Sequence, residues 1–298
     1  MGIYSRDQHK SEVIAFLQKH FSSQKWEITP PPKGTGNETY FAKSNGQAYF
    51  IKLGAQIEKH QVMSSLGISP QVIEIGYLED GTSILIQNQI NARKPTRRDF
   101  HQYFSKFAQA IRITHQSESM IRILPKKSSN SYKDVGLEIL AQIKRRWEKY
   151  KSKVSSSVEY VDERIENLVF QIRQFRGSGL VASHNDICNA NWLVSQDGNI
   201  YLIDFESMSQ DDPALDIGAL LWWYYPANMR DEFLGLVGYG KDEYFRNRMR
   251  IRMAVYCLNI ILPRENSFDK FEDDSFDDSL EDFRAIIEGR ENPKGYND

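Results

Sequence analysis

Residues 183–207 read SHNDICNANWLVSQDGNIYLIDFES, and this stretch places three oxygen-bearing side chains around one short hairpin. Asp186 and Asn191 lie five residues apart in a loop that precedes the strand-like residues 192–194. A Gln-Asp-Gly turn leads into a return strand, and Asp204 follows that strand directly. Because a tight hairpin aligns the start of one strand with the end of the next, we expect the three side chains at one end of the small sheet.

These residue types in this order are typical of a site for a hard cation beside a phosphorylated substrate. Mg²⁺ prefers oxygen ligands and usually binds one or two carboxylates together with substrate phosphates. Asn191 and Asp204 would supply the protein oxygens, which leaves Asp186 to accept or orient a hydroxyl proton. Asp and Asn also mark ordinary turns, and any one of these residues alone would be interpreted in that way. The set at this spacing, with a strand between, favours the functional interpretation.

The same residues carry a resemblance to a known family. HNDICNAN fits the His-x-Asp-x4-Asn catalytic loop of the aminoglycoside phosphotransferase and choline kinase superfamily, and IDFES is similar to its metal-binding segment. The pair HND and IDFE resembles the choline/ethanolamine kinase branch more than the antibiotic branch. The resemblance implies that Asp186 is the catalytic base, that Asn191 and Asp204 hold Mg²⁺, and that ATP is the donor. His184 would be the structural histidine of the loop. Asp216 would brace the loop or, alternatively, cap a helix.

The rest of the sequence agrees with the fold that this resemblance implies, which is α+β and two-lobed like a protein kinase. Short strands and one helix fill the first ninety residues, whereas helical apolar stripes dominate from about residue 96 onward. We therefore predict a small β-rich N-terminal nucleotide-binding lobe at residues 1–90 and a larger, mainly helical catalytic and substrate-binding lobe at residues 91–298. The predicted elements include helices at 5–22, 56–66, 97–116, 134–150 and 160–176 and strands at 40–42, 47–53, 71–77 and 83–90.

Phosphoryl transfer needs positive charge near the nucleotide phosphates, and Lys52 is the candidate. It lies at the end of the strand-like run AYFIKL and is similar to the family's strand lysine. Glu58, early in the next helix, is its expected ion-pair partner, and Glu74 is the alternative. The resemblance also implies a glycine-rich phosphate loop, for which a plain turn is the alternative, and an adenine-binding connection between the lobes. These nucleotide contacts fall on Gly34, Thr35, Gly36, Asn37, Asn88 and Ile90.

The acceptor is indicated only by aromatic and acidic residues. Trp222, Trp223 and Tyr224 belong to a run of aromatic residues, and aromatic faces bind ammonium groups through cation–π attraction. Consecutive residues cannot all face one side of a helix, so some of them belong to the core. Eight acids between residues 267 and 282 would attract a cationic substrate or, alternatively, form a solvated surface. Both features favour an amine-bearing alcohol such as choline or ethanolamine.

Composition narrows the class of protein. The chain has 298 residues and a net charge of −2, so no overall basic field indicates nucleic acid. Two cysteines do not indicate a disulfide framework, and no signal-peptide or membrane-spanning run is evident. We expect a cytoplasmic protein that binds a small-molecule alcohol, without nucleic-acid or membrane partners; the oligomeric state is left open. An aminoglycoside, thiamine or sugar kinase and a non-catalytic pseudokinase are the alternatives, whereas DFE in place of DFG disfavours a protein kinase.

Overall fold

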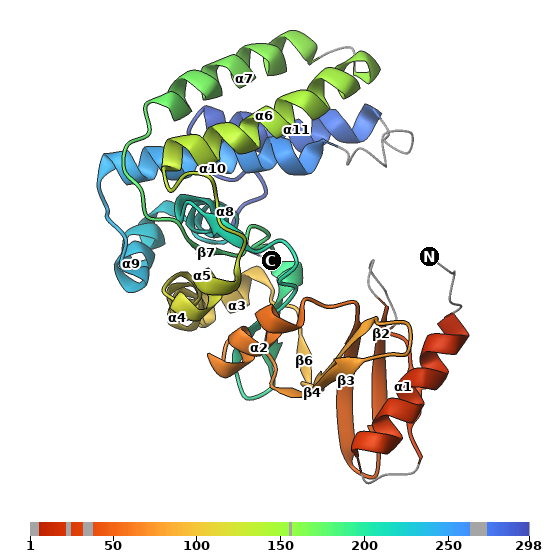
Figure 1. The fold of residues 1–298 in the computed structure, drawn as a ribbon. Helices are drawn as coiled ribbons and strands as arrows, with labels where there is room; N and C mark the ends of the chain where they lie inside the picture. The colour runs from red at the N-terminus through yellow and green to blue at the C-terminus, as the bar shows by residue number, and fades with distance from the viewer. Residues whose placement is uncertain (1–5, 22–24, 32–37, 155–156, 263–272, 298) are drawn as a thin grey trace. The chain divides into compact units, whose positions relative to one another are not determined.

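The computed structural model describes residues 6–21, 25–31, 38–154, 157–262 and 273–297 (Figure 1). Two compact units are present. We call them the N-terminal unit, made of Met1–Arg93 and Trp192–Glu206, and the helical unit, made of Lys94–Asn191 and Ser207–Asp298. The hairpin that carries Asp204 therefore belongs to the N-terminal unit. The predicted assignment of residues 1–90 to nucleotide binding and 91–298 to catalysis concerns function and stays a prediction.

Five antiparallel strands form the main sheet of the N-terminal unit, in the order β1-β2-β3-β5-β4. The predicted turn between β2 and β3 is present at Asn45 and Gly46, whose φ angles of 44° and 82° are left-handed, as a two-residue type I′ turn requires. The predicted strands all exist, with ends shifted by a few residues. The bounds are β1 Glu27–Thr29, β2 Thr39–Ser44, β3 Gln47–Leu53, β4 Val72–Tyr77 and β5 Ser83–Asn88.

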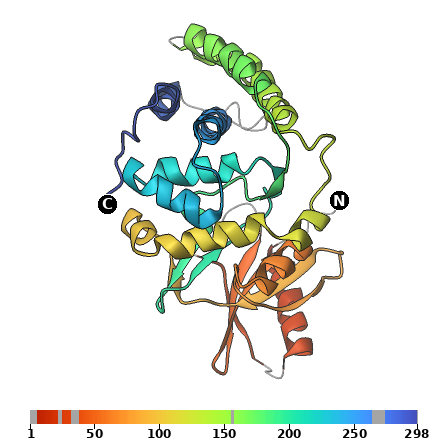
Figure 2. The same cartoon turned by 90° about the vertical axis from the view of Figure 1, so that its left-hand side faces the viewer.

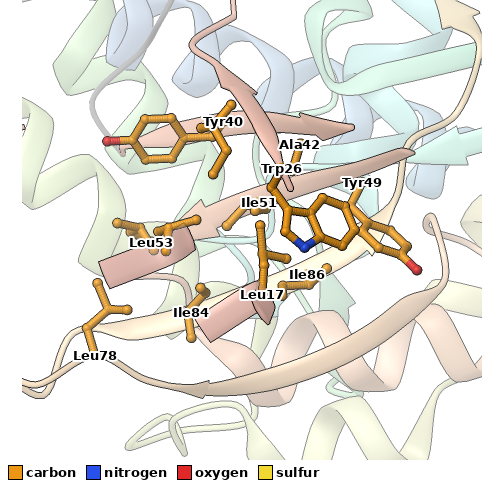
Figure 3. Close-up of a cluster of buried hydrophobic side chains, with 12 residues drawn as sticks. Leu17, Trp26, Tyr40, Ala42, Tyr49, Ile51, Leu53, Leu78, Ile84 and Ile86 are labelled. Atoms are coloured by element: carbon orange, nitrogen blue, oxygen red, sulfur yellow. The ribbon is translucent and has the colours of Figure 1, made fainter. Parts of the chain in front are cut away.

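One face of this sheet packs against helix α1, Arg6–His20 (Figure 3). Successive strand residues point to opposite faces, so alternate residues of the central strands share the apolar side. Gly76 leaves room for α1, because a Cβ there would be 2.6 Å from the Phe16 ring. The buried cluster includes Val13, Leu17, Trp26, Tyr40, Ala42, Tyr49, Ile51, Leu53, Ile84 and Ile86.

The same alternation directs Lys52 away from this apolar cluster, because its neighbours Ile51 and Leu53 point into it. The rest of the N-terminal unit comprises helix α2, Ile57–Ser65, and a separate three-stranded sheet in the order β6-β8-β9. The predicted hairpin is confirmed as β8 paired with β9. The bounds of this sheet are β6 Ala92–Arg93, β8 Trp192–Ser195 and β9 Ile200–Leu202.

Helix α10 lies in the core of the helical unit, and every residue from Ile251 to Leu258 is buried. This helix packs against α8 and α11, and Figure 2 views α10 and α11 nearly end-on. A short antiparallel pair, β7 with β10, leads into the loop that contains Asp186. The bounds are α3 Arg97–Gln102, α4 Phe104–His115, α5 Glu118–Ile123, α6 Tyr132–Tyr150, η1 Lys151–Lys153, α7 Val158–Arg173, β7 Val181–Ser183, η2 Asn189–Asn191, β10 Ser209–Asp211, α8 Ala214–Tyr224, α9 Ala227–Val237, α10 Glu243–Ile261 and α11 Asp273–Ile287.

One predicted helix is corrected. The stretch 97–116 forms two helices, because Tyr103 adopts φ −105° and ψ 28° and interrupts the helical backbone between α3 and α4. Thr96 begins α3 with a reciprocal capping box to Asp99. Within the described ranges, no helix is long and apolar enough to cross a bilayer.

The close packing of α8 on α10 depends on Gly218. A Cβ at this position would lie 2.8 Å from the main-chain oxygen of Met249, which cannot swing aside as a side chain would. Ala normally stabilises a helix interior relative to Gly, so here propensity and packing act in opposite directions. Packing dominates, because overfilling a tight contact costs about 1–3 kcal/mol.

We expect Gly218→Ala to lower the free energy of unfolding, measured by urea denaturation. Gly235→Ala in α9 is the matched control, because a Cβ there would meet only the flexible end of Lys241 at 3.4 Å. That control is expected to be neutral or to stabilise by up to about 1 kcal/mol. Equal stability of the two variants would contradict the close-contact interpretation.

Candidate active site

A buried carboxylate fixes the loop that contains Asp186. Asp216, in the first turn of α8, accepts hydrogen bonds from the main-chain N–H groups of His184 at 2.7 Å and Asn185 at 3.0 Å. Asn185 has a left-handed φ of 64°, a conformation that Asn tolerates better than most residues. His184 is completely buried beside it. The geometry is that of a loop brace and not of a helix cap, since Pro213 occupies the N-cap position of α8.

His115 keeps this buried carboxylate ionised. Its Nε2 lies 3.1 Å from Asp216 Oδ2, and its Nδ1 lies 2.8 Å from the hydroxyl of Tyr239. Burial acts to raise the pKa of Asp216, but the hydrogen bond and charge of His115, with the charge and main-chain N–H of His184, outweigh it and leave the pKa lowered. A charged acceptor strengthens each of the bonds that hold the loop.

The carboxylate of Asp186 has a donor on each oxygen. Tyr256 donates its hydroxyl to Oδ1 at 3.0 Å, and Asn191 Nδ2 donates to Oδ2 at 2.9 Å. The same Nδ2 also donates to the main-chain oxygen of Asp186 at 2.8 Å. Burial, and then the charge of Asp186, raise the pKa of Tyr256, so the phenol stays protonated and remains a donor. Two donors on separate oxygens fix the plane of a half-buried carboxylate.

Tyr256 was missed by sequence reasoning. It lies in the middle of α10, seventy residues beyond Asp186. The sequence of its segment predicts a helix with apolar residues on several sides, and nothing in that pattern marks one tyrosine as a partner of Asp186.

The predicted metal ligands have the donor chemistry that magnesium requires. The Asn191 amide nitrogen is engaged with Asp186, which leaves the amide oxygen as the ligand atom. Asp204, in the N-terminal unit, has a half-exposed carboxylate on a residue with a left-handed φ of 68°. One of its oxygens, Oδ1, lies 3.2 Å from Lys52 Nζ. An amide oxygen and a carboxylate are each ligand types of a cation that completes its shell with phosphate and water.

Lys52 is buried and forms ion pairs with Asp204 and Glu206. Burial raises the pKa of Glu206, the neighbouring Asp204 carboxylate adds to this, and Lys52 opposes it. The expected pairing of Lys52 with Glu58 is wrong in this structure. Helix α2 directs Lys59, His60 and Met63 inward, so the Glu58 side chain is on the exposed face. The alternative Glu74 is likewise not a partner of Lys52, and its carboxylate lies 3.6 Å from a ring nitrogen of His20.

The predicted adenine contacts are only partly accessible to a ligand. The main-chain N–H of Asn88 donates to the Gln71 carbonyl at 3.0 Å, and that of Gln89 donates to the Ala48 carbonyl at 3.0 Å. Those two N–H donors are therefore already used within the N-terminal unit. The half-buried Ile90 remains the better candidate for a main-chain contact to adenine. The predicted phosphate-loop residues Gly34, Thr35, Gly36 and Asn37 lie outside the described residues.

The three predicted substrate aromatics have different surroundings. Tyr224 accepts the main-chain N–H of Asn189 at 2.7 Å and stacks on Phe100, so it supports the loop that contains Asp186. Trp222 is buried and lines a cavity of about 250 Å³ among α8, α9, α10 and the end of α11. Only Trp223 is half-exposed and packs edge-on against Tyr256, with ring centroids 5.6 Å apart. The Tyr256 side chain therefore contacts both Trp223 and Asp186.

The acidic stretch is described only in part, because residues 267–272 lie outside the described ranges. Two of its acids are paired with basic side chains of the same unit. Glu281 lies 2.8 Å from Arg290, and Asp282 lies 2.8 Å from Lys294. These two carboxylates are thus partly neutralised.

Comparison with known proteins identifies the family. A family model described as the phosphotransferase enzyme family matches residues 27–249. A choline/ethanolamine kinase family protein from Mesorhizobium loti is similar in structure, with a TM-score of 0.69 and 16% identity over 97% of this chain and 95% of that chain. The GDP complex of aminoglycoside 2′-phosphotransferase-IIIa has a TM-score of 0.69 and 13% identity over 96% of this chain and 99% of that chain. A spectinomycin phosphotransferase in complex with ADP and spectinomycin has a TM-score of 0.64 and 15% identity over 93% of this chain and 98% of that chain.

The chain belongs to the phosphotransferase enzyme family, and the predicted enzyme class, a phosphotransferase, is confirmed. The predicted superfamily and the two-lobed, protein-kinase-like α+β fold class are confirmed. The resemblance to the choline/ethanolamine branch in particular stays a prediction, since the structural neighbours include both branches at 13–17% identity.

We expect Asp216→Asn to lower the free energy of unfolding by about 3 kcal/mol near pH 7, because the buried donors lose a charged acceptor. The pKa of Asp216 is lowered in the folded state, so this contribution is fully present above the unfolded pKa of about 3.9 and is lost as the pH falls through the folded pKa. Chemical denaturation of both proteins between pH 3 and 8 measures the difference.

Asp134→Asn, at an exposed acid in the first turn of α6, is the control and should change stability by less than about 0.5 kcal/mol at every pH. A wild-type advantage over Asp216→Asn that stays constant down to pH 3 would contradict a buried charge at Asp216.

Proposed function

We propose that this protein transfers the γ-phosphate of ATP to the hydroxyl of a small amine-bearing alcohol, with choline and ethanolamine as the first acceptors to test. The observation that carries the proposal is the Asp186 carboxylate, held on both oxygens by Tyr256 and Asn191 in a loop braced by Asp216. A positioned carboxylate of this kind is what hydroxyl activation requires.

In this proposal Asp186 accepts the acceptor's hydroxyl proton while the hydroxyl oxygen forms a bond to the γ-phosphorus and the bond to ADP breaks. Asn191 and Asp204 would hold magnesium, which neutralises phosphate charge when bound with the nucleotide. Lys52 would bind the phosphates. Ile90 and Asn88 would meet the adenine, and residues 34–37 would form the phosphate loop. The two solved relatives with GDP and ADP support a nucleoside triphosphate donor, so GTP should be assayed beside ATP.

The amine-bearing acceptor is favoured by Trp223. Its half-exposed ring packs on Tyr256, whose hydroxyl contacts Asp186, so a cation held against this face would present its hydroxyl near the base. The Mesorhizobium loti relative supports choline or ethanolamine, whereas the other two relatives support an aminoglycoside or spectinomycin. All of these are amine-bearing alcohols. Thiamine and sugars are further candidates.

A nucleotide-binding pseudokinase is the alternative from another class, and the presence of Lys52, Asp186, Asn191 and Asp204 argues against it. We also propose a cytoplasmic location, because Cys188 and Cys257 are unbridged thiols, which suits a reducing compartment.

An acceptor panel tests the proposed reaction. Purified protein with magnesium and ATP or GTP is incubated with choline, ethanolamine, thiamine, sugars and aminoglycosides, and the phosphorylated product is detected by mass spectrometry. We expect product with at least one amine-bearing alcohol. Asp186→Ala should lower kcat by a factor of about 10² to 10⁴, because a positioned base contributes this much, while nucleotide affinity is retained. No product with any acceptor would favour the pseudokinase, and near wild-type kcat in Asp186→Ala would disprove the assigned base.

Trp223 tests how the acceptor is selected. Trp223→Leu should raise KM for a cationic acceptor about tenfold, because a partly desolvated cation–π contact is worth roughly 1–2 kcal/mol, while KM for ATP stays the same. Trp223→Phe keeps an aromatic face and should raise the KM for the acceptor by a smaller factor. Equal KM values for the acceptor in wild type and Trp223→Leu would exclude Trp223 from the acceptor site.

A further inference from the structure

Helix α2 contacts the segment Asp204–Glu206 through a lysine. Lys59 is buried and donates its ammonium to the main-chain oxygen of Phe205 at 3.0 Å and to that of Glu206 at 3.3 Å. Burial lowers the pKa of Lys59, against the opposing effect of the Glu206 charge. A buried ammonium is costly unless its donors are engaged, so the two carbonyls account for its position.

The next residue of the helix holds the same segment by its side chain. The ring of His60 packs edge-on against the ring of Phe205, with centroids 5.0 Å apart, and both residues are buried. Phe205 is thus contacted at its carbonyl by Lys59 and at its ring by His60. All of these residues belong to the N-terminal unit.

The segment needs such support because its own backbone is unfavourable. Asp204 adopts a left-handed φ of 68°, two residues beyond the end of β9, where no strand pairing holds it. Residues other than glycine adopt this conformation at a cost, and it persists where surrounding contacts determine it. One side-chain contact to Asp204 is the ion pair with Lys52, which also pairs with Glu206.

Catalysis places conflicting demands on that side-chain contact. In the proposed function Lys52 binds nucleotide phosphates and Asp204 binds magnesium, so both side chains exchange their mutual ion pair for the ligand. The bonds from Lys59 end on main-chain oxygens, which neither magnesium nor phosphate has to displace. They can therefore persist while the ion pair is exchanged.

We propose that Lys59 is a positioning residue that holds the main chain of Asp204–Glu206, so that the Asp204 carboxylate is presented to the magnesium–nucleotide complex. This inference rests on the proposed function and deepens it. It also gives a role to Lys59 on the inward face of α2. The sequence had predicted a different contact from this helix, an ion pair from Glu58 to Lys52.

Calorimetric titration with the β,γ-imido analogue of ATP, in magnesium and separately in EDTA, tests the inference without any acceptor. Magnesium should strengthen wild-type binding. Lys59→Met keeps the aliphatic stem but loses the ammonium, and it should reduce the magnesium-dependent gain by about tenfold, as expected when support of a metal ligand is removed. Affinity in EDTA should stay within about twofold, which also shows that the unit is folded.

Lys43→Met is the matched control, because it removes an exposed lysine from β2 of the same unit, and it should leave both affinities unchanged. Lys59→Arg keeps the charge and the donors and should retain most of the gain. A magnesium-dependent gain that survives in Lys59→Met overturns the inference alone. So does an equal loss in Lys59→Met and Lys59→Arg, which would indicate a disturbed helix. A wild-type protein with no magnesium-dependent gain would overturn both the proposed function and this inference.

Discussion

One buried carboxylate accepts hydrogen bonds from two consecutive main-chain N–H groups, and these bonds organise the loop that contains Asp186. Asp216 can remain charged in the interior only because His115 and the amides of His184 and Asn185 satisfy it. The same bonds hold Asn185 in a left-handed conformation that sets the direction of the chain into Asp186. The brace in turn depends on the placement of α8, which approaches α10 as closely as Gly218 permits. A glycine contact between two helices therefore bears on the position of the proposed base.

Acidic residues of this protein are stabilised in distinct ways that match distinct uses. In the helical unit, buried Asp211 and Asp212 pair with Arg252 at 2.6 Å and Arg248 at 3.0 Å, and burial raises their pKa values in spite of these arginines. Those pairs fasten α10 to the segment after β10. Asp186 instead receives neutral donors and stays half-buried, and Asp204 keeps a half-exposed carboxylate. Carboxylates that stay accessible in this way are the ones suited to bind a ligand or accept a proton.

Local chemistry made the hairpin, the Asn45-Gly46 turn and the strand carrying Lys52 predictable, because each is encoded within a few neighbouring residues. The family followed from the spacing of Asp186, Asn191 and Asp204. What could not be predicted depends on tertiary packing. The pairing of Lys52 with Glu206 instead of Glu58 follows from the rotation of α2 about its axis, and IEKHQVMSS has too few apolar residues to fix that rotation. Tyr256 meets Asp186 only through the packing of α10, which no local pattern encodes.

The contrast between locally encoded residues and contacts made by tertiary packing also explains why the motifs define the reaction more sharply than the acceptor. Proton transfer and phosphate neutralisation need a few charged groups, most of them within one short segment. In the proposed function, recognition of the acceptor depends on α8 and α10, whose side chains meet by packing. Tyr256 connects the two requirements, because its hydroxyl orients Asp186 while its ring contacts Trp223. Any change that moves this ring also moves a donor on the proposed base. If the proposed roles of Trp223 and Asp186 hold, acceptor choice and base orientation are physically coupled, and selection for a new acceptor would be constrained by the need to keep that hydroxyl in place.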